Sequence, residues 1–232
     1  MIDQEQLADL IRIDPEVWFS TFAVIKDKRG KDIKPKANTL QKRMFAHYRK
    51  CQLEDKPCKM VILKPRQKGA STCAQALTYH HMRKHENLNG SLMGDIAGTS
   101  DKVFEIYRRY ADNDVFPWED GSSNMEDGGS LADLIKLRTG SHYGKETAGS
   151  KNAGRSGTIQ VGNMTETAFW TTTGRGDPAL AFLQSLYDED NISLVIADST
   201  PNGPSGWFYN TWVQDNEWAK VFAAWFEFED SR

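Results

Sequence analysis

The sequence predicts an α/β fold in which a mostly parallel central sheet is flanked by helices. Short apolar runs at residues 60–63, 91–94 and 192–197 have the length of strands, and segments with helical spacing of apolar residues lie between them. The run at 192–197 is interrupted only by Ser193, which indicates a strand buried on both faces. In such a fold, ligands bind at the carboxyl ends of the strands.

Composition and charge place the chain among soluble globular proteins. Its 232 residues are 39% hydrophobic and 26% charged, and a net charge of −3 argues against a protein that coats nucleic acid over its whole surface. No run approaches the about 18 apolar residues of a membrane span, and residues 1–6 lack the features of a secretion signal. Cys51, Cys58 and Cys73 are odd in number and lack C-x-x-C spacing, so neither a disulfide framework nor a zinc site is indicated.

The first quarter of the chain is expected to form helices and one hairpin. In order, these are a helix at 3–11, a helix from Asp14-Pro15, a lysine-rich hairpin at 23–34 and a helix at 40–50 capped by Asn38. The last helix carries Gln41 in its first turn, where an amide can read an adenine edge through its paired donor and acceptor. An exposed helix glutamine is the alternative.

After the strand at 60–63, short elements alternate with polar loops. We expect a strand at 91–94, a helix capped by Thr99 or Ser100, a loop at 117–130, paired strands at 131–137 and from His142, a polar loop at 144–157, a helix from Asp177-Pro178 with Leu180, Leu183 and Leu186 on its inner face, a helix near 207–212 and a strand at 221–228. The loop at 144–157 carries Lys145, Lys151 and Arg155, and it is either a DNA-facing or nucleotide-sensing element or a connector.

Residues 61–72 carry the strongest chemical signal. An apolar run enters a turn crowded with cations, one glycine follows, and Ser71-Thr72 open a segment with helical spacing. This order is typical of a phosphate-binding loop, because the backbone N–H groups and the positive end of the helix dipole face the phosphates. The hydroxyl of Ser71 or Thr72 can then bind Mg²⁺. A solvated basic turn is the alternative.

The loop departs from the usual G-x-x-x-x-G-K-[ST] pattern. Ala70 stands where the phosphate-binding lysine is expected, and the first glycine is missing. A charge-assisted contact contributes about 1.5–3 kcal/mol, so a nearby cation has to supply it. Lys64, Arg66 and Lys68 are the candidates. We favour Lys64 for the β- and γ-phosphates, with Arg66 beside it or sensing the γ-phosphate.

A second signal is the strand that ends at Thr165-Glu166. It brings a carboxylate to the same sheet edge as the phosphate loop, where Glu166 can polarise a water for in-line attack on a γ-phosphate. An Asp-Glu pair is expected at such a strand end, with the Asp holding Mg²⁺ through water, but Thr165 replaces the Asp. The metal would then depend on Ser71, Thr72 and the nucleotide's own oxygens. A glutamate at an exposed strand end is the alternative.

A third signal is the Ser-Thr-Pro-Asn-Gly segment at 199–203, which follows the apolar run at 192–197. Small hydroxyls at a strand tip can hydrogen-bond a γ-phosphate or its attacking water, and they thereby report hydrolysis to the rest of the fold. A turn without that role is the alternative.

Taken in order, these segments resemble the ATPase domain of tailed-phage terminase large subunits. The resemblance rests on the glutamine-led helix, the loop from Lys64 to Thr72, the strand end at Thr165-Glu166, and residues 199–203 preceding Trp207. It implies a P-loop NTPase fold of the additional-strand type, ATP and Mg²⁺ as cofactors, and a motor that drives double-stranded DNA into a procapsid.

The resemblance also implies a role for each site residue. Gln41 would read adenine. Lys64, Arg66, Gln67, Lys68, Gly69, Ala70, Ser71 and Thr72 would form a deviant Walker A loop, Glu166 would be the catalytic carboxylate, and Ser199, Thr200, Pro201, Asn202 and Gly203 would form the coupling motif. Ser71, Thr165 and Glu166 are the candidate metal ligands. Arg66 and Arg155 are the candidates for the arginine that completes the site.

The implied organisation is an N-terminal helical and hairpin segment at 1–58, which belongs to the ATPase domain, and a P-loop core at 59–232. We expect no DNA cleavage, since the family's C-terminal nuclease domain lies outside this chain. The implied partners are double-stranded DNA, the portal protein, the small terminase subunit and further copies in a ring, with a monomer in isolation. The host cytoplasm is the implied compartment. A helicase-like ATPase and a catalytically weakened assembly module are the alternatives.

Overall fold

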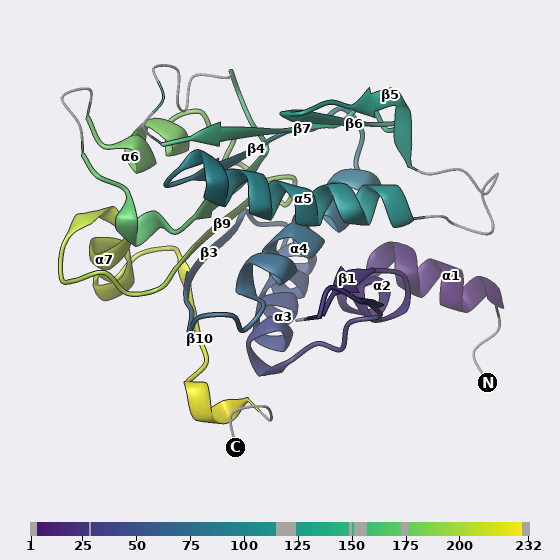
Figure 1. The fold of residues 1–232 in the computed structure, drawn as a ribbon, viewed down its shortest axis with the longest axis horizontal. Coiled ribbons are helices and arrows are strands. Elements are labelled where there is room, and N and C mark those ends of the chain that lie inside the picture. Colours follow the sequence, from purple (N-terminus) through teal and green to yellow (C-terminus); the bar gives the residue numbers. More distant parts are fainter. Residues whose placement is uncertain are drawn as a thin grey trace.

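The computed structural model describes residues 4–27, 29–114, 124–148, 150, 157–172 and 176–228 (Figure 1). The elements are α1 (Gln4–Ile13), α2 (Pro15–Thr21), β1 (Ile25–Lys26), β2 (Asp32–Ile33), α3 (Thr39–Leu53), β3 (Cys58–Leu63), α4 (Ala70–Lys84), β4 (Asn89–Gly94), α5 (Ala97–Asn113), β5 (Met125–Ser130), β6 (Leu134–Leu137), β7 (His142–Thr147), β8 (Val161–Thr165), α6 (Pro178–Leu183), β9 (Leu194–Ser199), α7 (Gly206–Val213) and β10 (Ala219–Phe222). Short 3₁₀ turns, η1 (Thr167–Phe169) and η2 (Trp225–Glu227), complete the described chain.

The described residues form a large sheet whose strands run in the order β10, β3, β9, β8, β4, β7, β6, β5. Neighbours from β10 to β7 are parallel, and β5, β6 and β7 pair antiparallel at one edge. The strands β1 and β2 form a separate antiparallel hairpin, as predicted for 23–34. The predicted α/β class with a mostly parallel sheet is therefore confirmed.

The two faces of the sheet are buried by different helices. Along β9, Leu194 and Ile196 belong to the apolar cluster that includes α2 to α5, whereas Val195 packs with Phe182 of α6. Successive side chains of a strand point to opposite faces, so an uninterrupted apolar run is what a strand between two helical layers requires. In Figure 1, α6 and α7 lie on the left of the molecule and α1 and α2 on the right.

Three sequence predictions at the antiparallel edge and beside it are wrong in whole or in part. Residues 125–130 form the strand β5 rather than a loop, since they pair with β6 through a register shift, near Gly128 with φ of 71°. Helix α5 begins at Ala97, before the predicted cap at Thr99 or Ser100. The Ser100 hydroxyl instead donates to the Glu146 carbonyl, 2.7 Å away, and ties the helix to β7. The predicted loop at 144–157 is a strand as far as Thr147.

The C-terminal third also differs in detail. Helix α6 buries Ala179 and Phe182, whereas Leu180 of the predicted stripe is exposed. The predicted strand at 221–228 ends at Phe222, and η2 follows it. Glu227 fixes this turn, because its carboxylate accepts from the Ala224 N–H at 2.7 Å and pairs with Arg43 at 2.6 Å. Among the described residues, no helix combines the length and apolar character needed to cross a membrane.

Candidate active site

The parallel strands bring the predicted site residues to one edge of the sheet. Lys64 follows β3, Glu166 follows β8, and Ser199 ends β9. The register pairs Leu63 with Ser199 across β3 and β9, and Thr165 with Asp198 across β8 and β9. Because these strands run in the same direction, their carboxyl ends meet, and the residues just beyond them surround a common space.

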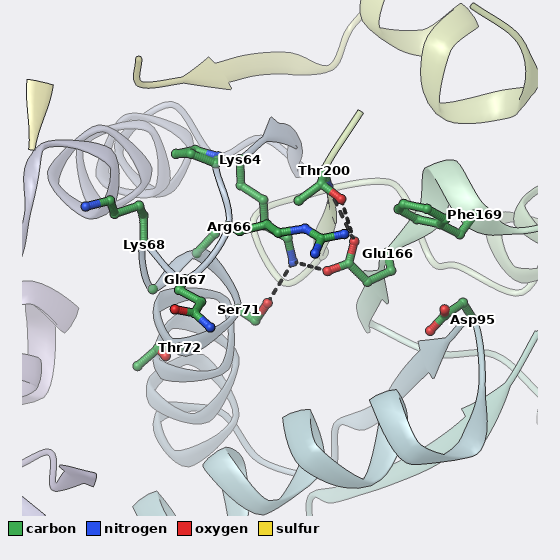
Figure 2. A pocket seen from close by; sticks show the side chains of 13 residues that line it. Lys64, Arg66, Gln67, Lys68, Ser71, Thr72, Asp95, Glu166, Phe169 and Thr200 are labelled. Atoms are coloured by element: carbon green, nitrogen blue, oxygen red, sulfur yellow. Dashed lines mark hydrogen bonds and ion pairs between the residues drawn. The ribbon is translucent and has the colours of Figure 1, made fainter. Parts of the chain in front are cut away.

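Lys64 occupies the centre of this edge. Its ammonium lies 3.1 Å from a Glu166 carboxylate oxygen, 3.0 Å from Asp198 Oδ2 and 3.0 Å from Ser71 Oγ, and Figure 2 shows the Glu166 and Ser71 contacts. The residue is 8% exposed. Burial has the largest influence on the Lys64 pKa and lowers it, but the charges and hydrogen bonds of Asp198 and Glu166 outweigh burial and raise the pKa above its ordinary value. The lysine is therefore held charged.

Asp198 belongs to the cluster around Lys64, and the sequence analysis missed it. It is 2% exposed, and its carboxylate accepts hydrogen bonds from Ser71 Oγ at 2.7 Å and from Thr165 Oγ1 at 2.8 Å. Thr165 thus holds Asp198 from the position where an aspartate was expected. The signal was present in the sequence, because Asp198 directly follows an apolar run of strand length, as a strand-end carboxylate does.

Glu166 connects the lysine to the segment at 199–203. Its Oε2 accepts from the Thr200 N–H at 3.3 Å, and the Thr200 and Ser199 hydroxyls each lie 3.5 Å away. Its φ of 56° is a left-handed conformation, which is uncommon outside glycine and recurs at functional sites. A shift of the Glu166 carboxylate therefore changes its contacts with Ser199 and Thr200 at the end of β9.

The predicted loop forms the entrance to α4. Gly69 precedes the helix with φ of 73°, and Gln67 also has a left-handed φ of 58°. These two residues turn the chain so that Ala70 and Ser71 begin a helix of 15 residues, whose amino end faces the Lys64 cluster. Unpaired N–H groups and the helix dipole favour an anion at this position.

Gln41 supports the loop from behind. Its amide oxygen accepts from the Asn38 N–H at 3.0 Å, and its amide nitrogen donates to the Gly69 carbonyl at 2.9 Å. Asn38 also donates to the Lys68 carbonyl at 3.0 Å. An amide oxygen and an amide NH₂ can each make one further hydrogen bond, so adenine recognition by Gln41 stays a prediction.

A cavity of about 490 Å³ lies in front of these residues, between the loop and the strand ends. The loop residues from Lys64 to Thr72, Asp95, Glu166, Phe169 and Thr200 line it. Arg66 is exposed, and in Figure 2 its side chain extends across the cavity in the direction of Glu166. Lys68 points away from Glu166 in this view, and its ammonium lies 5.0 Å from the centre of the Phe228 ring.

Among the described residues, six that were predicted for the site do not line this cavity: Gln41, Thr165, Ser199, Pro201, Asn202 and Gly203. Pro201, Asn202 and Gly203 line a separate apolar hollow beside α7, and the Asn202 amide donates to the Ala168 carbonyl at 3.0 Å. Arg155, predicted as a candidate finger arginine, and Lys151 lie outside the described residues.

Comparison with known proteins gives a structural likeness. No family model and no curated protein matches the sequence. The chain is similar to the large terminase of bacteriophage HK97, with a TM-score of 0.60 and 16% identity over 81% of this chain and 37% of that one. It is similar to the large terminase ATPase domain of Thermus phage P74-26, with a TM-score of 0.56 and 15% identity over 83% of this chain and 82% of that one.

A third similar structure is the large terminase of a thermophilic bacteriophage in complex with ADP, with a TM-score of 0.58 and 11% identity over 80% of this chain and 44% of that one. The chain therefore spans less than half the length of two of these proteins. At identities this low the likeness concerns the fold alone. The chain shares the fold of the large terminase ATPase domains, as the sequence predicted.

Proposed function

We propose that this chain hydrolyses ATP at the carboxyl ends of β3, β8 and β9, as the motor domain of a viral DNA-packaging terminase. The carrying observation is the position of Lys64, within 3.1 Å of two carboxylates and a hydroxyl that come from three separate segments. The likeness to terminase ATPase domains and the helix start at this cavity support the same function.

The phosphates of ATP would lie against the loop and the amino end of α4. Lys64 is buried and already charged, so it supplies the cation that Ala70 cannot supply. Arg66 is exposed at the mouth of the cavity and would contact the γ-phosphate or assist a neighbouring copy. The Lys64 ammonium would exchange carboxylate contacts for phosphate contacts when the nucleotide enters.

The donor set at the loop fits Mg²⁺. This ion prefers carboxylate and hydroxyl oxygens together with phosphates and waters, and Asp198 and Ser71 offer such oxygens 2.7 Å apart. When bound, Mg²⁺ would neutralise charge on the phosphate oxygens. In this arrangement Asp198 takes the role expected of an aspartate at the end of β8. Thr165, which stands at that position, orients Asp198. Thr165 therefore acts as a positioning residue.

Glu166 would orient and deprotonate the attacking water. Its side chain is 25% exposed and faces the cavity, while its second oxygen is held by Thr200. Loss of the γ-phosphate changes the charge that Glu166 faces, and the contacts with Ser199 and Thr200 pass this change to β9. This is the coupling that a motor needs between hydrolysis and movement.

We also propose for this chain the partners that the resemblance implies. Double-stranded DNA, the portal protein, the small terminase subunit and neighbouring copies in a ring would act in the host cytoplasm. An arginine supplied by a neighbour contributes about 10³–10⁵ in rate, so the isolated monomer should be a slow ATPase. Arg66 and Arg155 are the residues to test in that role.

The test measures nucleotide binding and ATP turnover at high protein concentration for Glu166→Gln and Lys64→Ala. Glu166→Gln should keep binding and lower turnover about 10²–10⁴-fold, whereas Lys64→Ala should weaken binding about 10–150-fold. The exposed residues Glu126 and Lys42 offer matched controls, Glu126→Gln and Lys42→Ala. Normal hydrolysis in both site variants would sink the proposal. ATP binding without turnover by the wild-type chain would favour an assembly module instead.

A further inference from the structure

A second polar cluster lies at the amino end of β3, away from the nucleotide cavity. It consists of His47 and Cys51, one turn apart on α3, and Cys58, the first residue of β3. Their ligand atoms lie within 4.8 Å of one another, and His47 Nε2 is 3.3 Å from Cys51 Sγ. Both cysteines are free thiols. We call these three residues the thiol cluster.

The chain between the two cysteines is folded so that their side chains meet. Helix α3 ends at Leu53, and Asp55 adopts a left-handed φ of 51°. The Lys56 N–H then donates to the Cys51 carbonyl at 3.1 Å, which closes the turn. Cys58 is fixed in β3 by its N–H, which donates to the Ser193 carbonyl at 2.9 Å. Backbone hydrogen bonds thus hold the two residues that carry the sulfur atoms next to each other.

The ligand types and spacing suit a thiophilic cation. Zn–S and Zn–N bonds of about 2.3 and 2.0 Å at a tetrahedral angle separate neighbouring sulfur and nitrogen ligands by roughly 3.5 Å. The observed 3.3 Å between His47 and Cys51 is close to this value, and the largest separation needs to close by about 1 Å. Cys58 is fully buried and Cys51 is 6% exposed, whereas His47 is partly exposed and leaves a route for the ion.

We propose that His47, Cys51 and Cys58 bind a Zn²⁺ ion, with water at the fourth position. Binding would release the two thiol protons to solvent and leave two thiolates and a neutral imidazole as ligands. The spacing H-x₃-C-x₆-C contains no C-x-x-C pair, so cysteine spacing alone excluded zinc. The helix supplies the missing proximity, because residues four apart lie on one face.

The experiment uses Co²⁺ as a spectroscopic probe for the Zn²⁺ site, with the full chain in a phosphine reductant. Wild-type protein should bind one Co²⁺ with a sulfur-to-cobalt charge-transfer band, and Zn²⁺ should displace it. Cys51→Ser and Cys58→Ser should lose that band. His47→Gln, a change at a partly exposed helix position, should weaken Co²⁺ binding at least about tenfold, the loss expected of a missing ligand.

Cys73 provides the matched control, because it is a buried free thiol on α4 outside the cluster. Cys73→Ser should keep the band and the stoichiometry. The proposal is overturned if the folded wild-type chain binds no Co²⁺ under reducing conditions, or if His47→Gln and Cys51→Ser bind it as tightly as wild type. Formation of a Cys51–Cys58 disulfide that persists in the reductant would also overturn it, since no thiolates would then be available.

Discussion

Strand β3 carries a polar cluster at each end, and the two clusters are built in opposite ways. At the carboxyl end, Lys64 meets Glu166 and Asp198, which come from the ends of other strands. At the amino end, His47, Cys51 and Cys58 come from twelve consecutive residues, 47–58. The first cluster is assembled by the pairing of the sheet, and the second by one helix and one turn.

The two ends of β3 therefore suit different kinds of ligand. Buried charges at the carboxyl end compensate one another, and removal of one partner leaves the other unpaired at a cost of about 3–5 kcal/mol. Such a site discriminates by charge, which fits the triphosphate and metal proposed for it. At the amino end, ligand atoms meet through backbone geometry, so the identity of the donor atoms, sulfur and nitrogen, decides what binds.

The largest effect is expected from moving the buried carboxylate between strands. Asp198→Thr should lower Mg²⁺-dependent ATP turnover about 10²–10³-fold, since about 3–4 kcal/mol of charge interaction is removed. Thr165 and Asp198 are register partners, so Thr165→Asp combined with Asp198→Thr returns a carboxylate to the same edge from β8. The double variant should be at least about tenfold faster than Asp198→Thr, because one recovered charge interaction of about 1.4 kcal/mol corresponds to a tenfold change in rate.

Two measurements test whether a carboxylate on β8 can replace Asp198 of β9. Steady-state turnover across a Mg²⁺ titration measures the rescue, and thermal unfolding establishes that each variant is folded. If the folded double variant is no faster than Asp198→Thr, a carboxylate on β8 cannot replace the one on β9. The carboxyl end would then depend on the individual residue rather than on the meeting of strand ends.

Gly69→Ala should disturb the same end through the backbone. The new Cβ would lie 2.7 Å from the Gln41 amide nitrogen, and the φ of 73° is unfavourable for alanine. Left-handed backbone and loss of the Gln41 hydrogen bond together should lower the free energy of unfolding by about 2–3 kcal/mol, measured in urea. Gly98→Ala is the control, because its Cβ meets nothing within 4 Å. Equal stability of the two variants would contradict this account.

The parallel centre of the sheet could be predicted, and its antiparallel flank could not. The runs that became β3, β4 and β9 are apolar because helices cover both faces, and burial of that kind is visible in sequence. The sequence of β5, Met-Glu-Asp-Gly-Gly-Ser, has no such pattern. It becomes a strand through pairing with β6, which depends on a partner and a bulge rather than on local propensity.

The site residues also fall into those that the sequence predicted and those that it did not. Lys64 was predicted because it follows an apolar run, and Glu166 because it follows a segment that was expected to be a strand. Both side chains also have a chemistry that suits the site. Asp198 was missed because its importance depends on which strand lies beside β8, and the register of β8 with β9 is a tertiary fact. The contact of Gln41 with Gly69 was equally hidden, since it joins residues 28 positions apart. The thiol cluster was hidden by cysteine spacing, although helical periodicity brings its first two members together.

Acid pH should affect the two ends of β3 differently. Below its ordinary pKa, Lys64 is charged in the folded and unfolded states, so its raised pKa contributes stability throughout the range from pH 5 to 7. Near the amino end of β3, two buried histidines of α4, His80 and His81, instead favour the uncharged form. His81 Nε2 lies 2.9 Å from the Ile192 carbonyl, and burial holds the His81 pKa well below its ordinary value. Acid should therefore act on this end first.

His80, next to His81 on α4, allows the test. Burial lowers the pKa of His80 to about 3, and its Nε2 donates to the Ile11 carbonyl at 3.0 Å. Below about pH 6.5, His80 is protonated in the unfolded chain but stays neutral in the folded chain. The free energy of unfolding therefore falls as pH falls, by about 2 kcal/mol for this one histidine at pH 5. His80→Gln keeps an amide donor for Ile11 but does not titrate. Urea unfolding at pH 7 and pH 5 should show a loss smaller by about 2 kcal/mol in this variant. An equal loss in both proteins would mean that protonation of His80 does not set the acid sensitivity of the fold.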